Sequence, residues 1–135
     1  MTLVAWWRRP VAALSLDVLL VVVFAAVGRA SHDETNPVVG ALWTAWPFLV
    51  GTAVGWLVVR VMRRTWPLDV APGVTVWFAT VAVGMVLRQA VGSGTAPSFV
   101  VVASLVLALF LLGWRALGGY AVRRAERPRV PELHG

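Results

Sequence analysis

The sequence contains no cysteine and no lysine, and only 13% of its 135 residues are charged. The lack of cysteine excludes disulfide bonds, thiolate metal sites and cysteine nucleophiles. The low charge accompanies a hydrophobic fraction of 59% and a mean hydropathy of +0.80, which a soluble domain cannot carry. Because one spanning helix needs about 20 apolar residues, the length allows four membrane crossings and leaves no room for a soluble catalytic domain.

Four long apolar runs, the first broken by Asp17, predict an all-α, polytopic membrane protein with four transmembrane helices. The spans are expected at about 11–28, 38–59, 70–88 and 97–117, so that residues 1–117 form the transmembrane domain and residues 118–135 a basic cytoplasmic tail. Pro47 in the second run predicts a kink, because proline removes one helical hydrogen bond and clashes with the preceding turn.

The twelve basic residues, all arginine, are distributed unevenly around these runs. Ten of them precede the first run or follow the second and fourth, and only Arg29 and Arg88 belong to the other side. Since cytoplasmic loops carry the excess of positive charge, we expect a multi-pass protein of the cell inner membrane with both termini in the cytoplasm. A removable secretory signal at the amino terminus is the alternative, and Asp17 inside that stretch argues against it.

When the sequence is aligned with itself at an offset of about 59 residues, Arg29 is aligned with Arg88 and Trp56 with Trp114. Two interpretations stay open. The four helices are either two repeated helical hairpins of equal orientation, or two unrelated hydrophobic hairpins that align because both need arginine at their inner ends.

Asp17 is the one acidic residue inside a predicted span. An ionised carboxylate near the middle of a membrane helix costs about 2.5–3.5 kcal/mol and needs a partner or a wet cavity. Thr52 on the second span, and Thr75 or Trp77 on the third, lie at a matching depth and are the expected hydrogen-bond donors. Asp17 then either binds a proton or cation, or fixes the packing of the helices, and both interpretations remain open.

A second cluster of polar side chains is expected where the first and third spans end. It consists of Arg29, His32 and Arg88. These residue types suit an extracytoplasmic site for an anion or a lipid headgroup, in which His32 titrates near neutral pH. The alternative is a set of boundary salt bridges with the neighbouring Asp33 and Glu34, in which the arginines reach toward water.

Small residues predict where the helices approach one another. Gly51 and Gly55 form a small-xxx-small motif on the second span, which in polytopic proteins packs helices within a chain more often than between chains. Gly84 shares one face of the third span with Trp77 and Arg88, so another backbone or a ligand is expected to approach that face. Four short helices enclose little volume, and a transport site would therefore need at least a homodimer.

The remaining patterns do not support an enzyme. Ser31, His32 and Asp33 are consecutive and cannot adopt the geometry of a catalytic triad. His32 and His134 lie on opposite sides of the predicted membrane, so we expect no metal site and no cofactor. The arginines after the fourth span are expected to attract anionic lipid headgroups of the bilayer, and no nucleic acid, because no stacking platform accompanies them.

Several short strings give the chain a resemblance to a known family. They are LD (16–17), VGRASH (27–32), WPF (46–48), TWP (65–67), VGMVLR (83–88) and GTAPSFV (94–100). In these strings the chain resembles the small four-helix membrane proteins of actinobacteria and archaea catalogued as domain of unknown function 3054, from about Pro10 to Trp114. The resemblance implies a bacterial inner-membrane protein of actinobacterial type, and it supplies no activity, ligand or catalytic residue.

From these residues we expect a small inner-membrane protein that binds or translocates a small solute or ion through a site using Asp17 and Arg88. The alternative function is that of a structural or accessory subunit in a larger membrane complex, where the polar residues only fix packing.

Overall fold

The computed structural model of the chain describes residues 3–29 and 36–128, and all regular structure within these ranges is helical. A short 3₁₀ helix and four long helices follow one another as η1 (Leu3–Arg8), α1 (Pro10–Arg29), α2 (Pro37–Arg63), α3 (Val70–Ala90) and α4 (Pro97–Ala125). Each of the four long helices is long and apolar enough to cross a membrane. The expected all-α architecture with four membrane helices is therefore confirmed.

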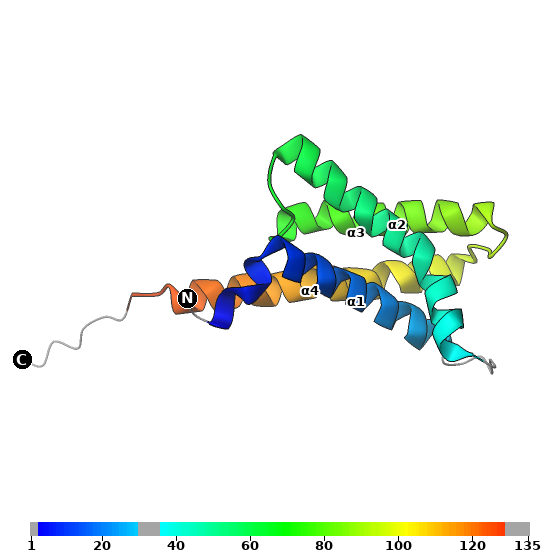
Figure 1. Ribbon diagram of the computed structural model, residues 1–135, viewed down its shortest axis with the longest axis horizontal. Helices are drawn as coiled ribbons and strands as arrows, with labels where there is room; N and C mark the ends of the chain where they lie inside the picture. The colour runs from blue at the N-terminus through cyan, green and yellow to red at the C-terminus, as the bar shows by residue number, and fades with distance from the viewer. Residues whose placement is uncertain (1–2, 30–35, 129–135) are drawn as a thin grey trace, which may run out of the picture.

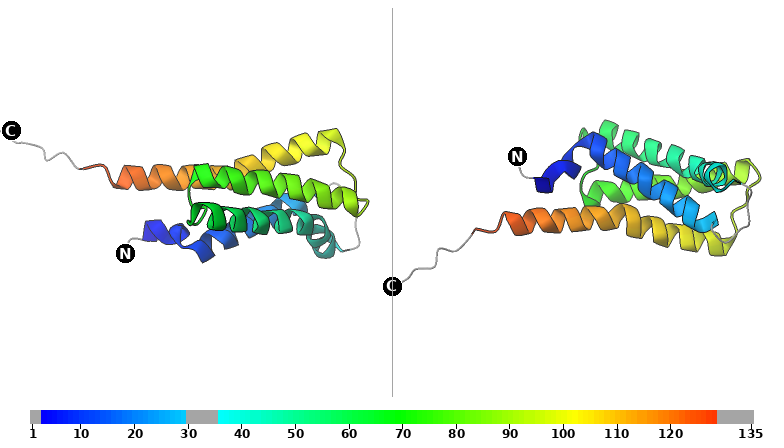
Figure 2. Two further views of the ribbon diagram at one scale, coloured as in Figure 1. Left: turned by 90° about the horizontal axis from the view of Figure 1, so that it is seen from above. Right: turned by 60° about the horizontal axis from the view of Figure 1, so that its bottom comes forward.

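The long helices form an elongated bundle, in which α3 and α4 run along its length and α2 crosses obliquely (Figure 1). The helix η1, the connection between α2 and α3 and the last turns of α4 lie together at one end of this bundle, which we call the arginine-rich end. Its arginines are Arg8, Arg9, Arg60, Arg63, Arg64, Arg123, Arg124 and Arg127. The turn from α3 to α4 lies at the opposite end, and Figure 2 shows that α4 is one uninterrupted helix between the two ends.

The helix starts follow from local sequence. Asn36 caps α2, because its side chain accepts a hydrogen bond from the backbone N–H of Val39 at 3.3 Å. Pro37 and Pro97 occupy the first turns of α2 and α4, where the missing N–H has no intrahelical partner to lose. All four starts fall within one residue of the predicted spans, whereas α4 continues past residue 117 to Ala125.

Helix α2 is the centre of the bundle. Half of its apolar span is buried (50%), compared with 22–28% for the other three helices. Pro47 lies inside α2, and the helix is visibly bent along its length in Figure 1, as the sequence indicates. Residues of α1, α2 and α4 form the larger buried cluster, which consists of Val21, Phe24, Phe48, Ala103, Leu107 and Leu111.

Three glycines of α2 and α3 lie where these two helices touch. A Cβ atom on Gly51 would lie 2.7 Å from the carbonyl oxygen of Ala79, and one on Gly55 would lie 2.8 Å from the Cα of Val76, so both glycines permit the close contact of α2 with α3. Gly84 faces α2 as well, where the ring of Phe48 fills the space that a side chain would need. Of the two neighbours expected at this face, another helix or a ligand, the structure therefore has the helix, and a side chain of α2 fills the space beside Gly84.

Candidate functional site

Asp17 lies fully buried between α1, α2 and α4, where it forms an ion pair with Arg115. The two terminal nitrogens of Arg115 donate to the two carboxylate oxygens at 2.9 and 2.7 Å. The indole N–H groups of Trp56 and Trp114 each donate to the same carboxylate at 2.8 Å. The carboxylate thus accepts four hydrogen bonds in a site that water does not reach.

Arg115 is held just as firmly on its other side. Its Nε donates to the carbonyl oxygen of Pro67 at 2.9 Å, and one terminal nitrogen also donates to the carbonyl of Leu111 at 2.7 Å. Gly73 at the start of α3 leaves room for the guanidinium, because a Cβ there would lie 2.9 Å from its Nε. The pair therefore joins α1, α4 and the connection between α2 and α3. These contacts favour the packing interpretation of Asp17 over that of a cation site.

The expected partners of Asp17 are wrong. The hydroxyl of Thr52 donates to the carbonyl of Phe48 in its own helix at 2.9 Å and lies 2.9 Å from the hydroxyl of Thr80. Trp77 donates to the carbonyl of Ser104 at 2.9 Å, and Thr75 makes no hydrogen bond to Asp17 either. Matching depth along a helix is not sufficient, because the rotation of each helix decides which side chains face one another.

Arg115 is the residue that sequence reasoning missed, since it was assigned to the basic group that follows the fourth span. One signal for it was present. Arg115 and the next basic residue, Arg123, are separated by about two helical turns of uncharged residues. Arg115 thus lies deeper in the bundle than the other arginines of α4, and its side chain is fully buried.

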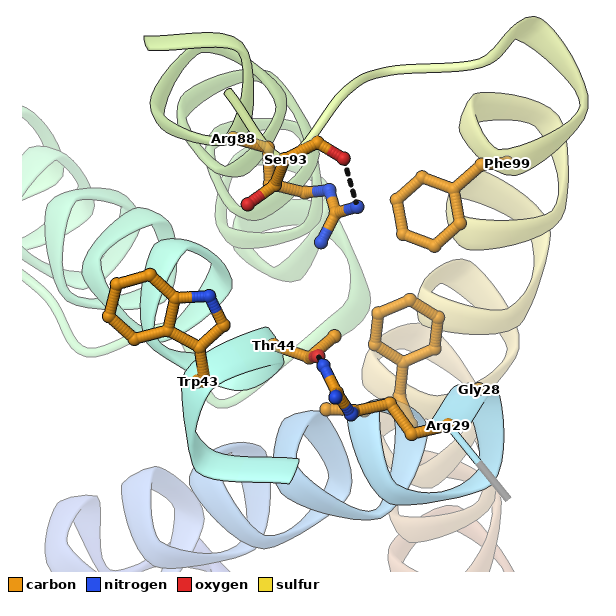
Figure 3. Close-up of a pocket in the computed structure, with 9 residues that line it drawn as sticks. Gly28, Arg29, Trp43, Thr44, Arg88, Ser93 and Phe99 are labelled. Carbon is orange, nitrogen blue, oxygen red and sulfur yellow. Dashed lines mark hydrogen bonds between the residues drawn. The ribbon is translucent and has the colours of Figure 1, made fainter. Parts of the chain in front are cut away.

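A cavity of about 310 Å³ lies at the opposite end of the bundle, and we call it the Arg29–Arg88 cavity. Its lining comes from all four helices and the α3–α4 turn, and consists of Phe24, Ala25, Gly28, Arg29, Trp43, Thr44, Arg88, Ser93 and Phe99. Figure 3 shows the Arg88 side chain on one side of the cavity and the Arg29 side chain, beside Thr44, on the other. Trp43 and Phe99 flank the two arginines.

The side chain of Arg88 is positioned by neutral groups. Its Nε donates to the carbonyl of Gly94 at 3.2 Å, and a terminal nitrogen donates to the carbonyl of Ser93 at 3.3 Å. Its guanidinium carbon lies 4.5 Å from the centre of the Phe99 ring, within the range of a cation–π contact. These contacts fix the guanidinium at the cavity wall without cancelling its charge.

Arg29 reaches the same cavity from the end of α1. Its terminal nitrogen donates to the hydroxyl of Thr44 at 2.8 Å. Arg29 and Arg88 are close enough to repel each other electrostatically. The arrangement brings two guanidinium groups to the wall of one cavity, and guanidinium groups are suited to bind an anion.

The structure brings together only part of the predicted site. Arg29 and Arg88 share a cavity, whereas Asp17 is bonded to Arg115 elsewhere and does not line it, so no joint site of Asp17 and Arg88 is formed. His32, together with Asp33 and Glu34, lies outside the described residues. Within residues 3–29 and 36–128 no cluster of histidine and acidic side chains is suited to hold a metal ion.

Comparison with known proteins assigns most of the chain to one family. A family model described as "Protein of unknown function (DUF3054)" matches residues 14–118, which confirms the resemblance seen in the sequence. No curated protein and no solved structure matches the chain. The matched stretch contains the Asp17–Arg115 pair and both arginines of the cavity.

Proposed function

Because the chain belongs to the DUF3054 family, whose function is unknown, we propose its function from the site itself. It is a multi-pass membrane protein that binds a small anionic group, a phosphate or a carboxylate, in the Arg29–Arg88 cavity. Two guanidinium groups from different helices converge on this one cavity, and that observation carries the proposal. Guanidinium is planar and always charged, and its N–H groups match the oxygens of phosphate and carboxylate.

An anion between the two arginines gains in three ways. It relieves their mutual repulsion, because a negative charge between two positive charges is attracted to both. It accepts charge-assisted hydrogen bonds from guanidinium groups that are already positioned by Thr44, Ser93 and Gly94. The hydroxyl of Thr44 accepts from Arg29 and keeps its own proton for donation to the ligand.

The orientation of the bundle is a further part of the proposal. The arginine-rich end faces the cytoplasm, since positive charge is retained there, and the Arg29–Arg88 cavity opens on the extracytoplasmic side. The chain has no cysteine, so a single introduced thiol reports its own position. Ser93→Cys in intact cells is expected to react with a membrane-impermeant maleimide, and Arg64→Cys is expected to react only after lysis. The reverse pattern contradicts the orientation.

The arginine-rich end is proposed to bind anionic lipid headgroups of the inner leaflet. Tyr120, Arg123, Arg124 and Arg127 line a surface pocket of about 520 Å³ on the last turns of α4. Each arginine near an anionic membrane surface contributes about 1 kcal/mol. This end therefore anchors the bundle at the interface, while anion recognition belongs to the other end.

Calorimetry on the full chain in an uncharged detergent tests the anion site, with sn-glycerol 3-phosphate as the probe. Arg88→Gln is expected to weaken binding about tenfold or more, because a hydrogen bond to a charged group is worth about 1.5–3 kcal/mol. Arg63→Gln is the matched control. It also removes one positive charge, but from an exposed position where α2 ends, at the arginine-rich end of the bundle. Equal affinity of the wild type and both variants contradicts the proposal.

A further inference from the structure

We infer that the anion of the Arg29–Arg88 cavity is the headgroup of an anionic membrane lipid, whose acyl chain lies on α2 beyond Trp43. The inference rests on the proposed function and names its ligand. It starts from a second, shallow and widely open apolar pocket of about 410 Å³ on the first turns of α2, lined by Val39, Leu42, Trp43 and Trp46. Trp43 lines both this pocket and the cavity, so the polar and the apolar space meet at one indole ring.

The lining of the apolar pocket suits a hydrocarbon chain. Val39, Leu42 and Trp43 are each more than half exposed at the surface of the bundle, so in a membrane they contact lipid. The ring of Trp43 lies 6.2 Å from that of Trp46, and the two indoles form one wall. Tryptophan is enriched at headgroup depth because its ring is apolar and its N–H is polar.

The charge of the cavity decides which lipid is bound. A choline headgroup carries a cation, which the guanidinium of Arg88 repels because, among the described residues, only neutral groups contact it, whereas a phosphate monoester on glycerol offers only negative oxygens. A free anion uses the cavity alone and makes no use of the apolar pocket, which bulk lipid then covers. A phosphatidate-like lipid fills both spaces at once, with its phosphate between the arginines and its chain across Trp43.

Photo-crosslinking in bilayers tests this assignment. The full chain is reconstituted with a trace of phosphatidate that carries a diazirine in the upper part of its acyl chain, or with phosphatidylcholine that carries the same chain. Labelling is measured by mass spectrometry at residues 39–46 and on the exposed face of α4 at Val101, Leu105 and Leu109. The ratio of phosphatidate to phosphatidylcholine labelling is expected to be about fivefold or more at residues 39–46 and close to one on α4.

Variants separate the headgroup from the chain. Arg88→Gln and Arg29→Gln are each expected to lower the ratio at residues 39–46 toward one, and Arg63→Gln is expected to leave it unchanged. Leu42→Gln makes the apolar pocket polar and is expected to lower the ratio, whereas Leu105→Gln, the same change on exposed α4, is not. Two arginine variants are used so that a folding defect in one of them does not decide the result.

Each outcome has a definite meaning. A ratio close to one at residues 39–46 overturns the inference, and if sn-glycerol 3-phosphate binding still depends on Arg88, the cavity binds free anions and the proposed function stands. Enriched labelling that survives both arginine substitutions overturns the headgroup assignment. If neither glycerol phosphate binding nor labelling depends on Arg88, the proposed function fails together with the inference.

Discussion

Replacing Asp17 by Asn is expected to destabilise the bundle strongly. The substitution keeps the size of the side chain but leaves Arg115 as a buried charge without a counter-charge. The NH2 group that replaces one carboxylate oxygen cannot accept, so one hydrogen bond from Arg115 and one from a tryptophan indole are lost. At about 1.5–3 kcal/mol each, the two bonds amount to about 3–6 kcal/mol. Removing one partner of a buried ion pair generally destabilises a protein by about 3–5 kcal/mol. The two figures therefore agree.

Equilibrium unfolding in mixed micelles of dodecylmaltoside and SDS, followed by tryptophan fluorescence, gives the free energy of unfolding. Asp69→Asn is the control, because Asp69 pairs with Arg8 at 3.6 Å with both side chains largely exposed, at 64% and 43%. An exposed pair of this kind contributes about 0–1 kcal/mol. Asp17→Asn is therefore expected to lower the free energy of unfolding several times more than Asp69→Asn does.

A double substitution tests whether the ion pair is the cause. Asp17→Leu combined with Arg115→Met removes both charges, and apolar replacement of a whole buried pair is often neutral. The double variant is therefore expected to be more stable than Asp17→Leu alone. The reasoning is refuted if Asp17→Asn costs no more than Asp69→Asn, or if the double variant is less stable than Asp17→Leu alone.

Three further substitutions test the packing of α2, each by thermal unfolding in detergent. Gly51→Val is expected to destabilise by about 1–3 kcal/mol, because its Cβ would lie 2.7 Å from the carbonyl of Ala79; an unchanged melting temperature would show that the helices separate freely there. Arg64→Gly is expected to stabilise by about 1 kcal/mol, since Arg64 ends α2 in the left-handed conformation with φ 54°; a loss of stability would contradict this. Trp46→Phe removes an indole N–H that is buried without a hydrogen-bond partner in the described part of the chain. The free energy of unfolding is therefore expected to stay within about 1 kcal/mol of the wild-type value. A larger loss would reveal a hydrogen bond to that N–H.

The helices were predictable because the length of an apolar run is a local property. Each predicted span is a long apolar stretch with at most one charged residue, and proline marks the starts of α2 and α4. The partner of Asp17 was not predictable by the same reasoning. It depends on how α1 and α4 are rotated about their axes, which is decided by the packing of all four helices together.

The alignment of one hairpin with the other also indicated which residues meet in the two sites. It paired Trp56 with Trp114, and both indoles donate to the carboxylate of Asp17. It also paired Arg29 with Arg88, and both line one cavity. Residues that correspond between the hairpins thus meet in space, while the repeat itself stays a prediction.

The separation of Asp17 from Arg115 along the chain has a consequence for biosynthesis. The two residues are 98 positions apart, so α1 enters the bilayer long before α4 has been translated. During that interval the carboxylate has no cation to pair with, and α1 has the highest mean hydropathy of the four helices, which favours its insertion despite the charge. Helix α2 delivers the first indole donor, and only α4 delivers the guanidinium. A nascent chain that stops before α4 therefore carries an acidic side chain in its first span without the guanidinium that pairs with it in the finished bundle.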